Sequence, residues 1–166
     1  VGIAHLPRIL DPRSTGSFVE ALRHDRLKWG AVGIFVYVGA EVAIGSYLVN
    51  YFLSMDLDQT VRSDARLAGL ASSMLGKDLA SVDAKGVVGA FVALYWGGAM
   101  VGRFIGSYLT RSFKPELVLA VFGGSAIAMI GLSMGTQGTT AMWSILAVGL
   151  FNSIMFPTIF TLAIEG

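Results

Sequence analysis

Four long apolar stretches, separated by polar segments, make up most of this chain of 166 residues. Charged residues gather between the stretches instead of alternating with apolar ones, which is not the pattern of helices around a soluble core. A helix of about 20 apolar residues crosses the roughly 30 Å hydrocarbon core of a bilayer. The pattern therefore predicts an all-α transmembrane protein whose spans cover about 29–52, 87–110, 117–135 and 141–164.

Two longer polar segments flank the first span. Residues 1–28 contain Pro7 and Pro12 and close with FVEALRHDRLK, whose spacing suits a short amphipathic helix at a membrane surface. Residues 53–86 form a loop on the other side, where five acids and four bases nearly cancel. Within this loop, ARLAGLASSMLG predicts a short surface helix.

Lysine and arginine residues indicate the orientation of the spans, because short cytoplasmic loops carry an excess of them. Three bases lie directly before the first span and two lie between the second and third, whereas the loop GTQGTT before the fourth span has none. Both chain ends and the second connection are therefore predicted to be cytoplasmic. The five bases are Arg23, Arg26, Lys28, Arg111 and Lys114.

Composition agrees with a membrane protein and excludes several other classes. Apolar residues make up 54% of the chain and charged residues 14%, against about 25% charged residues in typical soluble domains. The formal net charge of +1 offers no basic excess for nucleic acid, and the absence of cysteine excludes disulfides and thiolate metal ligands. The spans carry no nucleophile–base pair, nucleotide-binding motif or metal cluster, so we expect neither an enzyme nor a bound cofactor.

Small residues recur every four positions in the second and third spans, which places each row on one helix face. Lipid offers no hydrophobic drive between helices, so such rows mark places where backbones approach closely. They predict a tightly packed bundle and point to no particular activity. The rows are Gly89, Ala93 and Gly97; Gly98, Gly102 and Gly106; and Ala120, Gly124 and Ala128.

Glu41 is the only charged residue of the first span and lies near its middle. A charge at that depth costs roughly 2.5–3.5 kcal/mol on insertion scales, so it must face a cavity or a partner, or be protonated. Tyr37 lies four residues earlier on the same helix face. We interpret both as candidate substrate-binding residues, with Glu41 as a ligand acceptor or proton-coupled group. The alternative is a carboxyl group that ties two helices together.

Asn152 lies in the middle of the uncharged fourth span, five residues before Pro157. Proline removes a backbone donor, so Pro157 is predicted to kink the helix near Asn152. The Asn152 amide could hold a hydroxyl-bearing ligand or bridge to another helix, and both alternatives stay open. Phe156 lies near the same stripe and is either a substrate contact or a packing residue.

Four further side chains need an interpretation. Arg103, one and a half to two turns inside the second span, is either a snorkelling anchor or an interhelical charge contact that locks one conformation. Asn50 and Tyr51 lie near the outer mouth of the first span, where either could contact substrate. Tyr95 is expected to pack at an interface or in the core.

Three segments carry a resemblance to a known family: FVYVGAEVAIGSYLVNYF at 35–52, ALYWGGAMVGRFIGSYL at 93–109 and AVGLFNSIMFPTIFTLAIEG at 147–166. They resemble helices seven, eight and ten of the fucose/glucose/galactose permeases, a branch of the major facilitator superfamily. The resemblance implies that the four spans are helices 7–10 of an expected twelve. It also implies that residues 1–28 are the cytoplasmic loop between two halves and that residues 29–166 are part of the C-terminal transporter domain.

The same resemblance implies secondary transport of a hexose or 6-deoxyhexose across the bacterial inner membrane, usually driven by protons and in some members by sodium. Substrate would bind between the two halves near the bilayer midplane. The partners would be the monosaccharide, the lipid bilayer, and the N-terminal half and last two helices of the same transporter. The family's main proton-coupling carboxylate is expected in that other half, so the resemblance does not make Glu41 the proton carrier. The alternative is a self-contained four-helix membrane protein that works as a dimeric small transporter or a scaffold.

Overall fold

The computed structural model describes residues 23–164 of the chain. The amphipathic stretch predicted at 18–28 and the predicted loop at 1–28 therefore fall mostly outside the described residues, as do residues 165–166. The long helices are α2 (Asp25–Ser54), α5 (Ala84–Ser112), α6 (Pro115–Gly135), α7 (Gly138–Asn152) and α8 (Met155–Ile164). Shorter elements fill the loop after α2, namely α3 (Leu57–Ser63), α4 (Ala65–Leu75) and the 3-10 turn η1 (Leu79–Ser81).

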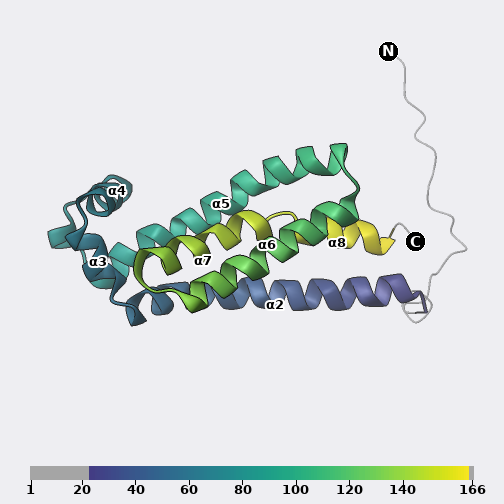
Figure 1. Ribbon diagram of the computed structural model, residues 1–166, viewed down its shortest axis with the longest axis horizontal. Coiled ribbons are helices and arrows are strands. Elements are labelled where there is room, and N and C mark those ends of the chain that lie inside the picture. The colour runs from purple at the N-terminus through teal and green to yellow at the C-terminus, as the bar shows by residue number, and fades with distance from the viewer. Residues whose placement is uncertain (1–22, 165–166) are drawn as a thin grey trace, which may run out of the picture.

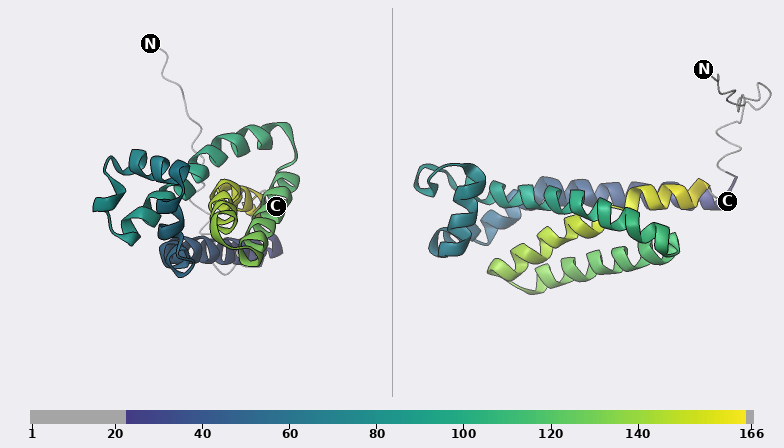
Figure 2. Two further views of the ribbon diagram at one scale, coloured as in Figure 1. Left: turned by 60° about the vertical axis from the view of Figure 1, so that its left-hand side comes forward. Right: turned by 90° about the horizontal axis from the view of Figure 1, so that it is seen from above.

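The four long segments lie lengthwise beside one another (Figures 1 and 2). Within the described residues, four helical segments are long and apolar enough to cross a membrane: α2, α5, α6, and α7 together with α8. The predicted all-helical fold with four spans is confirmed. Each helix begins a few residues before the predicted apolar stretch, because the polar residues that flank a span continue the helix into the interface.

The loop between the first two spans folds into a cap, which we define as residues 55–83. The cap contacts α2, α5 and α7 through α3, whose Leu57 and Val61 are fully buried. Arg62 holds it together by donating hydrogen bonds to the carbonyl oxygens of Leu79 and Val82, the latter at 2.7 Å. The predicted surface helix exists as α4, but the segment also contains α3 and η1, which the charge-rich sequence did not predict.

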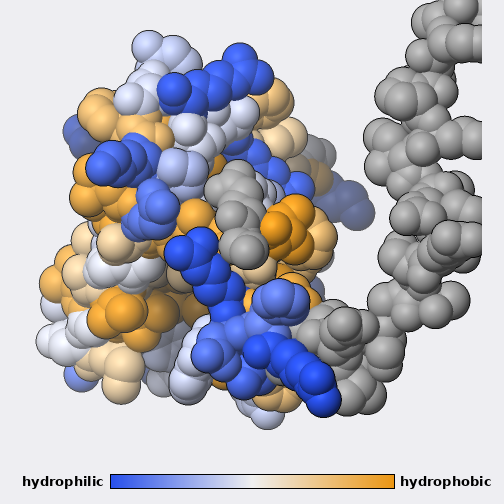
Figure 3. All heavy atoms as spheres, turned by 90° about the vertical axis from the view of Figure 1, so that its right-hand side faces the viewer, coloured by the Kyte–Doolittle hydropathy of each residue, from blue (hydrophilic) through white to orange (hydrophobic). Residues whose placement is uncertain are grey.

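The beginning of α2, the connection from α5 to α6 and the end of α8 lie at one end of the bundle, opposite the cap (Figure 1). Figure 3 looks onto this end, where strongly hydrophilic side chains lie around apolar ones. The described residues there include five bases and two acids, whereas the cap and its flanks carry four bases and five acids. The predicted orientation, which rests on these same bases, places this end of the bundle in the cytoplasm and stays a prediction.

The fourth span is broken in its middle, where α7 ends at Asn152 and α8 begins at Met155. Pro157 has no N–H to donate to the carbonyl of Ser153, four residues earlier, so the helical ladder cannot continue through this point. The sequence predicts a kink near Asn152, and the structure has a two-residue break there. The break lets the chain change direction between α7 and α8 (Figure 1).

One of the three predicted rows of small residues packs against the break. A Cβ atom added to Gly102 would overlap the carbonyl of Leu150 and the hydroxyl of Ser153, and one added to Gly106 would overlap Ile154. Gly98 completes the row with ordinary contacts to Leu150. The other two rows lack such contacts among the described residues: nothing lies within 4 Å of a Cβ built on Gly89, Gly97 or Gly124, and Ala93, Ala120 and Ala128 are exposed. Those faces point away from the four-helix bundle.

Candidate functional site

A cavity of about 410 Å³ opens beside the break in the fourth span. Glu41 and Tyr37 line it from α2, and Arg103 lines it from α5. The break and the first turn of α8 supply the remaining wall with Ser153, Phe156 and Pro157. Five of the sequence-predicted residues are thus brought to one place near the middle of the spans, together with Ser153, which the sequence did not single out. The five are Tyr37, Glu41, Arg103, Phe156 and Pro157.

Glu41 and Tyr37 face this cavity because they lie one turn apart on α2. Glu41 is partly buried, and Tyr37 is only 8% exposed. The Tyr37 hydroxyl donates a hydrogen bond of 2.8 Å to the backbone carbonyl of Asn152, at the last residue of α7. Tyr37 therefore connects the helix that carries Glu41 to the break.

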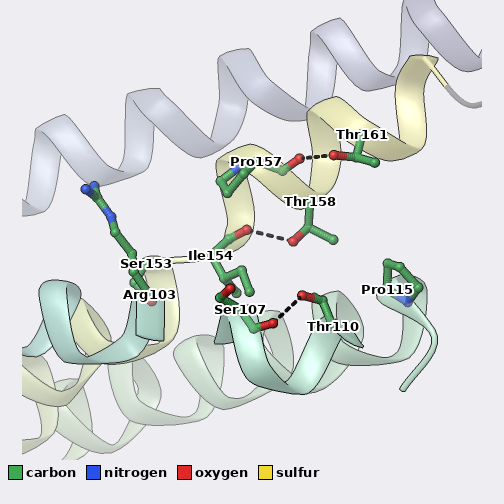
Figure 4. Close-up of a pocket in the computed structure, with 9 residues that line it drawn as sticks. All are labelled: Arg103, Ser107, Thr110, Pro115, Ser153, Ile154, Pro157, Thr158 and Thr161. Carbon is green, nitrogen blue, oxygen red and sulfur yellow. Dashed lines mark hydrogen bonds between the residues drawn. The ribbon is translucent and has the colours of Figure 1, made fainter. Parts of the chain in front are cut away.

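Arg103 extends from α5 toward α2, as Figure 4 shows. It also lines a second cavity of about 510 Å³ between α5 and α8, which includes the hydroxyl side chains of Ser107, Thr110 and Thr161. Among residues 23–164 the salt bridges consist of one exposed pair, Lys28 with Asp25 at 2.7 Å. Arg103 and Glu41 therefore line one cavity with opposite charges but do not form an ion pair in this structure.

Asn152 serves as a bridge between helices. Its side-chain amide donates to the hydroxyl of Tyr95 on α5 at 3.3 Å, and Tyr95 is fully buried. Of the two alternatives that the sequence left open for Asn152, the structure contains the interhelical bridge. Tyr95 packs in the core, as its sequence position indicated.

The remaining two candidates, Asn50 and Tyr51, lie away from this cavity. Asn50 is exposed and, nine residues after Glu41 at about 100° per residue, lies on the opposite side of α2. The Tyr51 hydroxyl lies 3.0 Å from both the carbonyl and the hydroxyl oxygen of Ser133 on α6. Tyr51 also lines a separate apolar cavity of about 310 Å³ near the cap. The structure therefore does not group these two residues with Glu41.

Phe156 contributes an aromatic surface at the edge of the site. Its ring stacks on Phe160 with centroids 6.5 Å apart and an interplanar angle of 9°, and both rings are about half exposed. Ser153 is a site residue that sequence reasoning missed. The available signal was its position four residues before Pro157, which identifies the residue whose carbonyl loses its helical donor.

Comparison with known proteins gives three informative relatives. The chain is 47% identical over 147 residues to a glucose/galactose transporter of Brucella abortus, which covers 89% of this chain and 30% of the relative. It is 41% identical over 140 residues to a putative glucose/galactose transporter of Helicobacter pylori, covering 84% and 28%. It is 30% identical over 154 residues to the L-fucose-proton symporter of Escherichia coli, covering 90% and 28%.

This chain belongs to the fucose/glucose/galactose permease family of the major facilitator superfamily. The family resemblance inferred from the three motifs is confirmed, because each alignment covers more than four-fifths of the chain. The chain spans about 30% of the length of the curated relatives that it matches. Those relatives are transporters and not enzymes, as predicted. No family model and no solved structure matches the chain.

Proposed function

We propose that this permease-family chain forms helices seven to ten of a twelve-helix, proton-coupled symporter for hexose or 6-deoxyhexose sugars in a bacterial inner membrane. Its relatives are named for glucose, galactose and L-fucose, which supports this substrate class. Because the chain matches only about 30% of their length, the other helices of the same transporter would form the opposite wall of the cavity. Sodium is the alternative coupling ion.

The observation that carries this proposal is the cavity beside the break, which holds a carboxylate and a guanidinium group that are not paired with each other. Charged groups within a membrane span are costly, and those that persist mark substrate or ion pathways. A sugar hydroxyl both donates and accepts hydrogen bonds, so it can satisfy an acceptor-only carboxylate and a donor-only guanidinium at once. A polyhydroxylated ligand therefore matches this cavity.

Each wall of the cavity would have a different role in binding a sugar. Glu41 would accept hydrogen bonds from sugar hydroxyls, and Arg103 would donate to their oxygen atoms. Phe156 would lie against the apolar face of the sugar ring, where aromatic side chains provide large contact area. Asn152 would contribute indirectly, because its backbone carbonyl and its side-chain NH2 group are already bonded to Tyr37 and Tyr95.

The test is sugar uptake by the full-length transporter that contains this chain, reconstituted in proteoliposomes. Labelled galactose, glucose and L-fucose are compared with and without an inward proton gradient, and we expect gradient-driven accumulation of at least one of them. Glu41→Gln should weaken sugar binding by about 10- to 100-fold, since a hydrogen bond to a charged group contributes about 1.5–3 kcal/mol. Glu116→Gln, at the exposed start of α6, is the matched control. Protein-free vesicles give the background uptake. Failure of the proton gradient to raise uptake of any of the three sugars above this background would contradict the proposal, as would normal sugar affinity in Glu41→Gln.

A further inference from the structure

The Trp96 side chain of α5 lies next to the residues that line the Glu41 cavity. Its six-membered ring faces Gly45 of α2, where an added Cβ atom would lie 3.4 Å from Cζ2 and 3.9 Å from Cη2. Gly45 follows Glu41 by four residues, so the two lie one turn apart on the same face of α2. Because α2 runs toward the cap (Figure 1), the indole ring lies about one helical turn from Glu41 on the side of the cap.

Arg103 shows which face of α5 is turned toward the site. It lines the Glu41 cavity, as expected for a charged group within a span, which faces a cavity or a partner instead of lipid. Trp96 precedes Arg103 by seven residues, which at about 100° per residue returns to within about 20° of the same direction. Trp96 therefore lies on the face of α5 that Arg103 turns toward α2 and the cavity.

The indole ring is held in place but is not covered. It meets the ring of Tyr95 edge-on, with centroids 5.4 Å apart at an interplanar angle of 90°. Tyr95 is fully buried and bonded to Asn152, so it provides a fixed support. Trp96 itself is 53% exposed, and Gly45 has no side chain that would cover it from α2. A fixed and uncovered aromatic surface can bind a ligand with little loss of side-chain freedom.

Phe156 lies on the opposite side of Glu41. Ile159 of α8 lies 3.5 Å from a Cβ atom built on Gly33, two turns before Glu41 on α2, and Phe156 is one turn nearer along α8. Along α2, Phe156 is thus on the side of the chain ends and Trp96 on the side of the cap. A ligand at Glu41 would have an aromatic side chain on each side.

We propose that Trp96 is a substrate-contact residue, the aromatic wall of the sugar site on the side of the cap. That the ligand is a sugar rests on the proposed function. A pyranose ring presents hydroxyl groups around its edge and C–H groups on its faces. The hydroxyl groups pair with Glu41 and Arg103, while C–H groups lie against the indole, whose ring face carries partial negative charge. Trp96 therefore favours cyclic sugars over open-chain polyols, which have hydroxyl groups but no ring face.

The first experiment measures tryptophan fluorescence of the full-length transporter in proteoliposomes, with Trp96 kept as its single tryptophan. In this chain that requires Trp29→Phe and Trp143→Phe, and tryptophans elsewhere are replaced in the same way. Galactose, glucose or L-fucose should shift the Trp96 emission to shorter wavelength and slow its quenching by acrylamide, because the bound sugar covers the ring. Galactitol, an open-chain polyol, should leave the emission unchanged at the same concentration.

A transporter whose single tryptophan is Trp143 is the matched control. Trp143 also meets a neighbouring ring edge-on, that of Phe91 at 6.3 Å and 82°, and it is 44% exposed. It lies on α7 and is not among the residues that line the Glu41 cavity. Its emission should therefore not respond to any of the sugars.

The second experiment measures uptake kinetics. Trp96→Leu should raise the KM of the transported sugar about tenfold, which is the upper range for a contact with one aromatic ring, and should leave the maximal rate nearly unchanged. Trp96→Phe keeps a ring and should recover most of the affinity. Gly45→Leu should raise the KM as Trp96→Leu does, because it displaces the indole, whereas Gly45→Ala fits the present contact and should behave like the wild type.

The inference is refuted if sugar leaves the Trp96 emission unchanged at a concentration that saturates uptake. A wild-type KM in Trp96→Leu would refute it as well. Should Trp96→Leu fail to fold, the transporter with Trp96 as its single tryptophan decides, because it keeps this side chain.

The outcomes also separate this inference from the proposed function. If Trp96 responds to a sugar that the proton gradient does not accumulate, Trp96 contacts sugar and the transport assignment fails. If sugars accumulate but Trp96 neither responds nor affects the KM, the proposed function stands and the role of Trp96 is wrong. Absence of both uptake and a fluorescence response would overturn both.

Discussion

The two halves of the bundle, on either side of the break at Ser153, are packed in different ways. The half toward the cap contains a continuous core in which Phe52, Phe91 and Tyr95 are fully buried. The half toward the chain ends has only a small buried cluster of Val118, Phe122 and Ile154. It also contains cavities of about 460, 470 and 510 Å³ along α8, which are larger than the cavity of about 310 Å³ near the cap. We call these the cap half and the terminal half.

This difference indicates where the molecule can change shape. A close-packed interior resists deformation, whereas cavities leave room for helices to shift. The candidate site lies at the boundary between the two halves, so α7 belongs to the packed half and α8 to the loosely packed one. A sugar bound at this boundary, as proposed above, would contact a closely packed wall at α7 and a wall lined by cavities at α8.

The largest expected effect comes from emptying the core of the cap half. Phe91→Ala removes a fully buried ring that meets Trp143 edge-on, with ring centroids 6.3 Å apart. Such truncations cost about 3–5 kcal/mol, because a cavity remains in a close-packed core. We expect a large drop in the thermal unfolding temperature of the detergent-solubilised transporter, followed by fluorescence.

The comparison between the halves is tested by Phe122→Ala in the terminal half. Phe122 packs edge-on against Phe151, with centroids 5.9 Å apart, but belongs to a small cluster. We expect a smaller loss of stability than for Phe91→Ala, while Phe104→Ala, at a position 73% exposed, should change little. A loss at Phe122 that equals or exceeds the loss at Phe91 would break the distinction between the halves.

A second prediction concerns the glycine row at the boundary. Gly102→Val would place a side chain against the Leu150 carbonyl and the Ser153 hydroxyl, and the backbone carbonyl cannot rotate away. Overpacking of this kind costs about 3 kcal/mol, at the upper end of its usual range. We expect reduced stability together with reduced transport, because α5 and the break must move apart to make room for the valine side chain.

Gly97→Val is the matched control for this row. Nothing lies within 4 Å of a Cβ built on Gly97, so the chain itself should tolerate the larger side chain. Both substitutions could lower the stability of the full-length transporter equally, while only Gly102→Val lowers the stability of this chain alone. That result would show that the face of Gly97 packs against helices outside this chain. Normal behaviour of Gly102→Val would contradict the packing described for the break.

The sequence predicted the spans and the break well, for physical reasons. Long apolar stretches have few alternatives to a membrane-crossing helix, and Pro157 locates a missing backbone donor within a residue or two. Most of the cap was not predicted, because α3 has only seven residues and its burial depends on contacts with α2 and with the more distant α5 and α7. The two glycine rows of α5 could not be ranked, since both have the same spacing and only the partner helix distinguishes them.

The candidate site could be predicted only in part. Glu41 stood out because an ionisable group inside a span is rare. The role of Asn152 could not be decided, because its partner Tyr95 lies 57 residues away in the sequence and the pairing exists only after folding. Asn50 was named a possible substrate contact from its place near the outer mouth of the first span, and helix geometry places it on the side of α2 opposite Glu41.

A smaller effect is expected within the cap. Arg62→Ala removes both hydrogen bonds to the carbonyl groups of Leu79 and Val82, which connect α3 to the segment before α5. The guanidinium is exposed, so we expect a loss of about 1.5 kcal/mol, at the low end for bonds to charged groups. Hydrogen exchange should become faster in residues 77–83 and stay unchanged in α5. Arg66→Ala is the control, and faster exchange throughout α5 would show that the cap is not a local unit.

The smallest expected effect is that of Tyr51→Phe, which compares the two halves through the loss of a single hydrogen bond. Tyr51 and Tyr37 both donate from α2 to a backbone carbonyl of another helix, but Tyr51 does so in the cap half, where α6 is continuous up to its end at Gly135. Losing this bond should cost about 1 kcal/mol and lower the unfolding temperature slightly. Sugar affinity should stay unchanged, because the packed core around Phe52 holds α2 in place without it. A change in sugar affinity as large as that expected for Glu41→Gln would contradict this prediction, and the division at Ser153 would then be wrong.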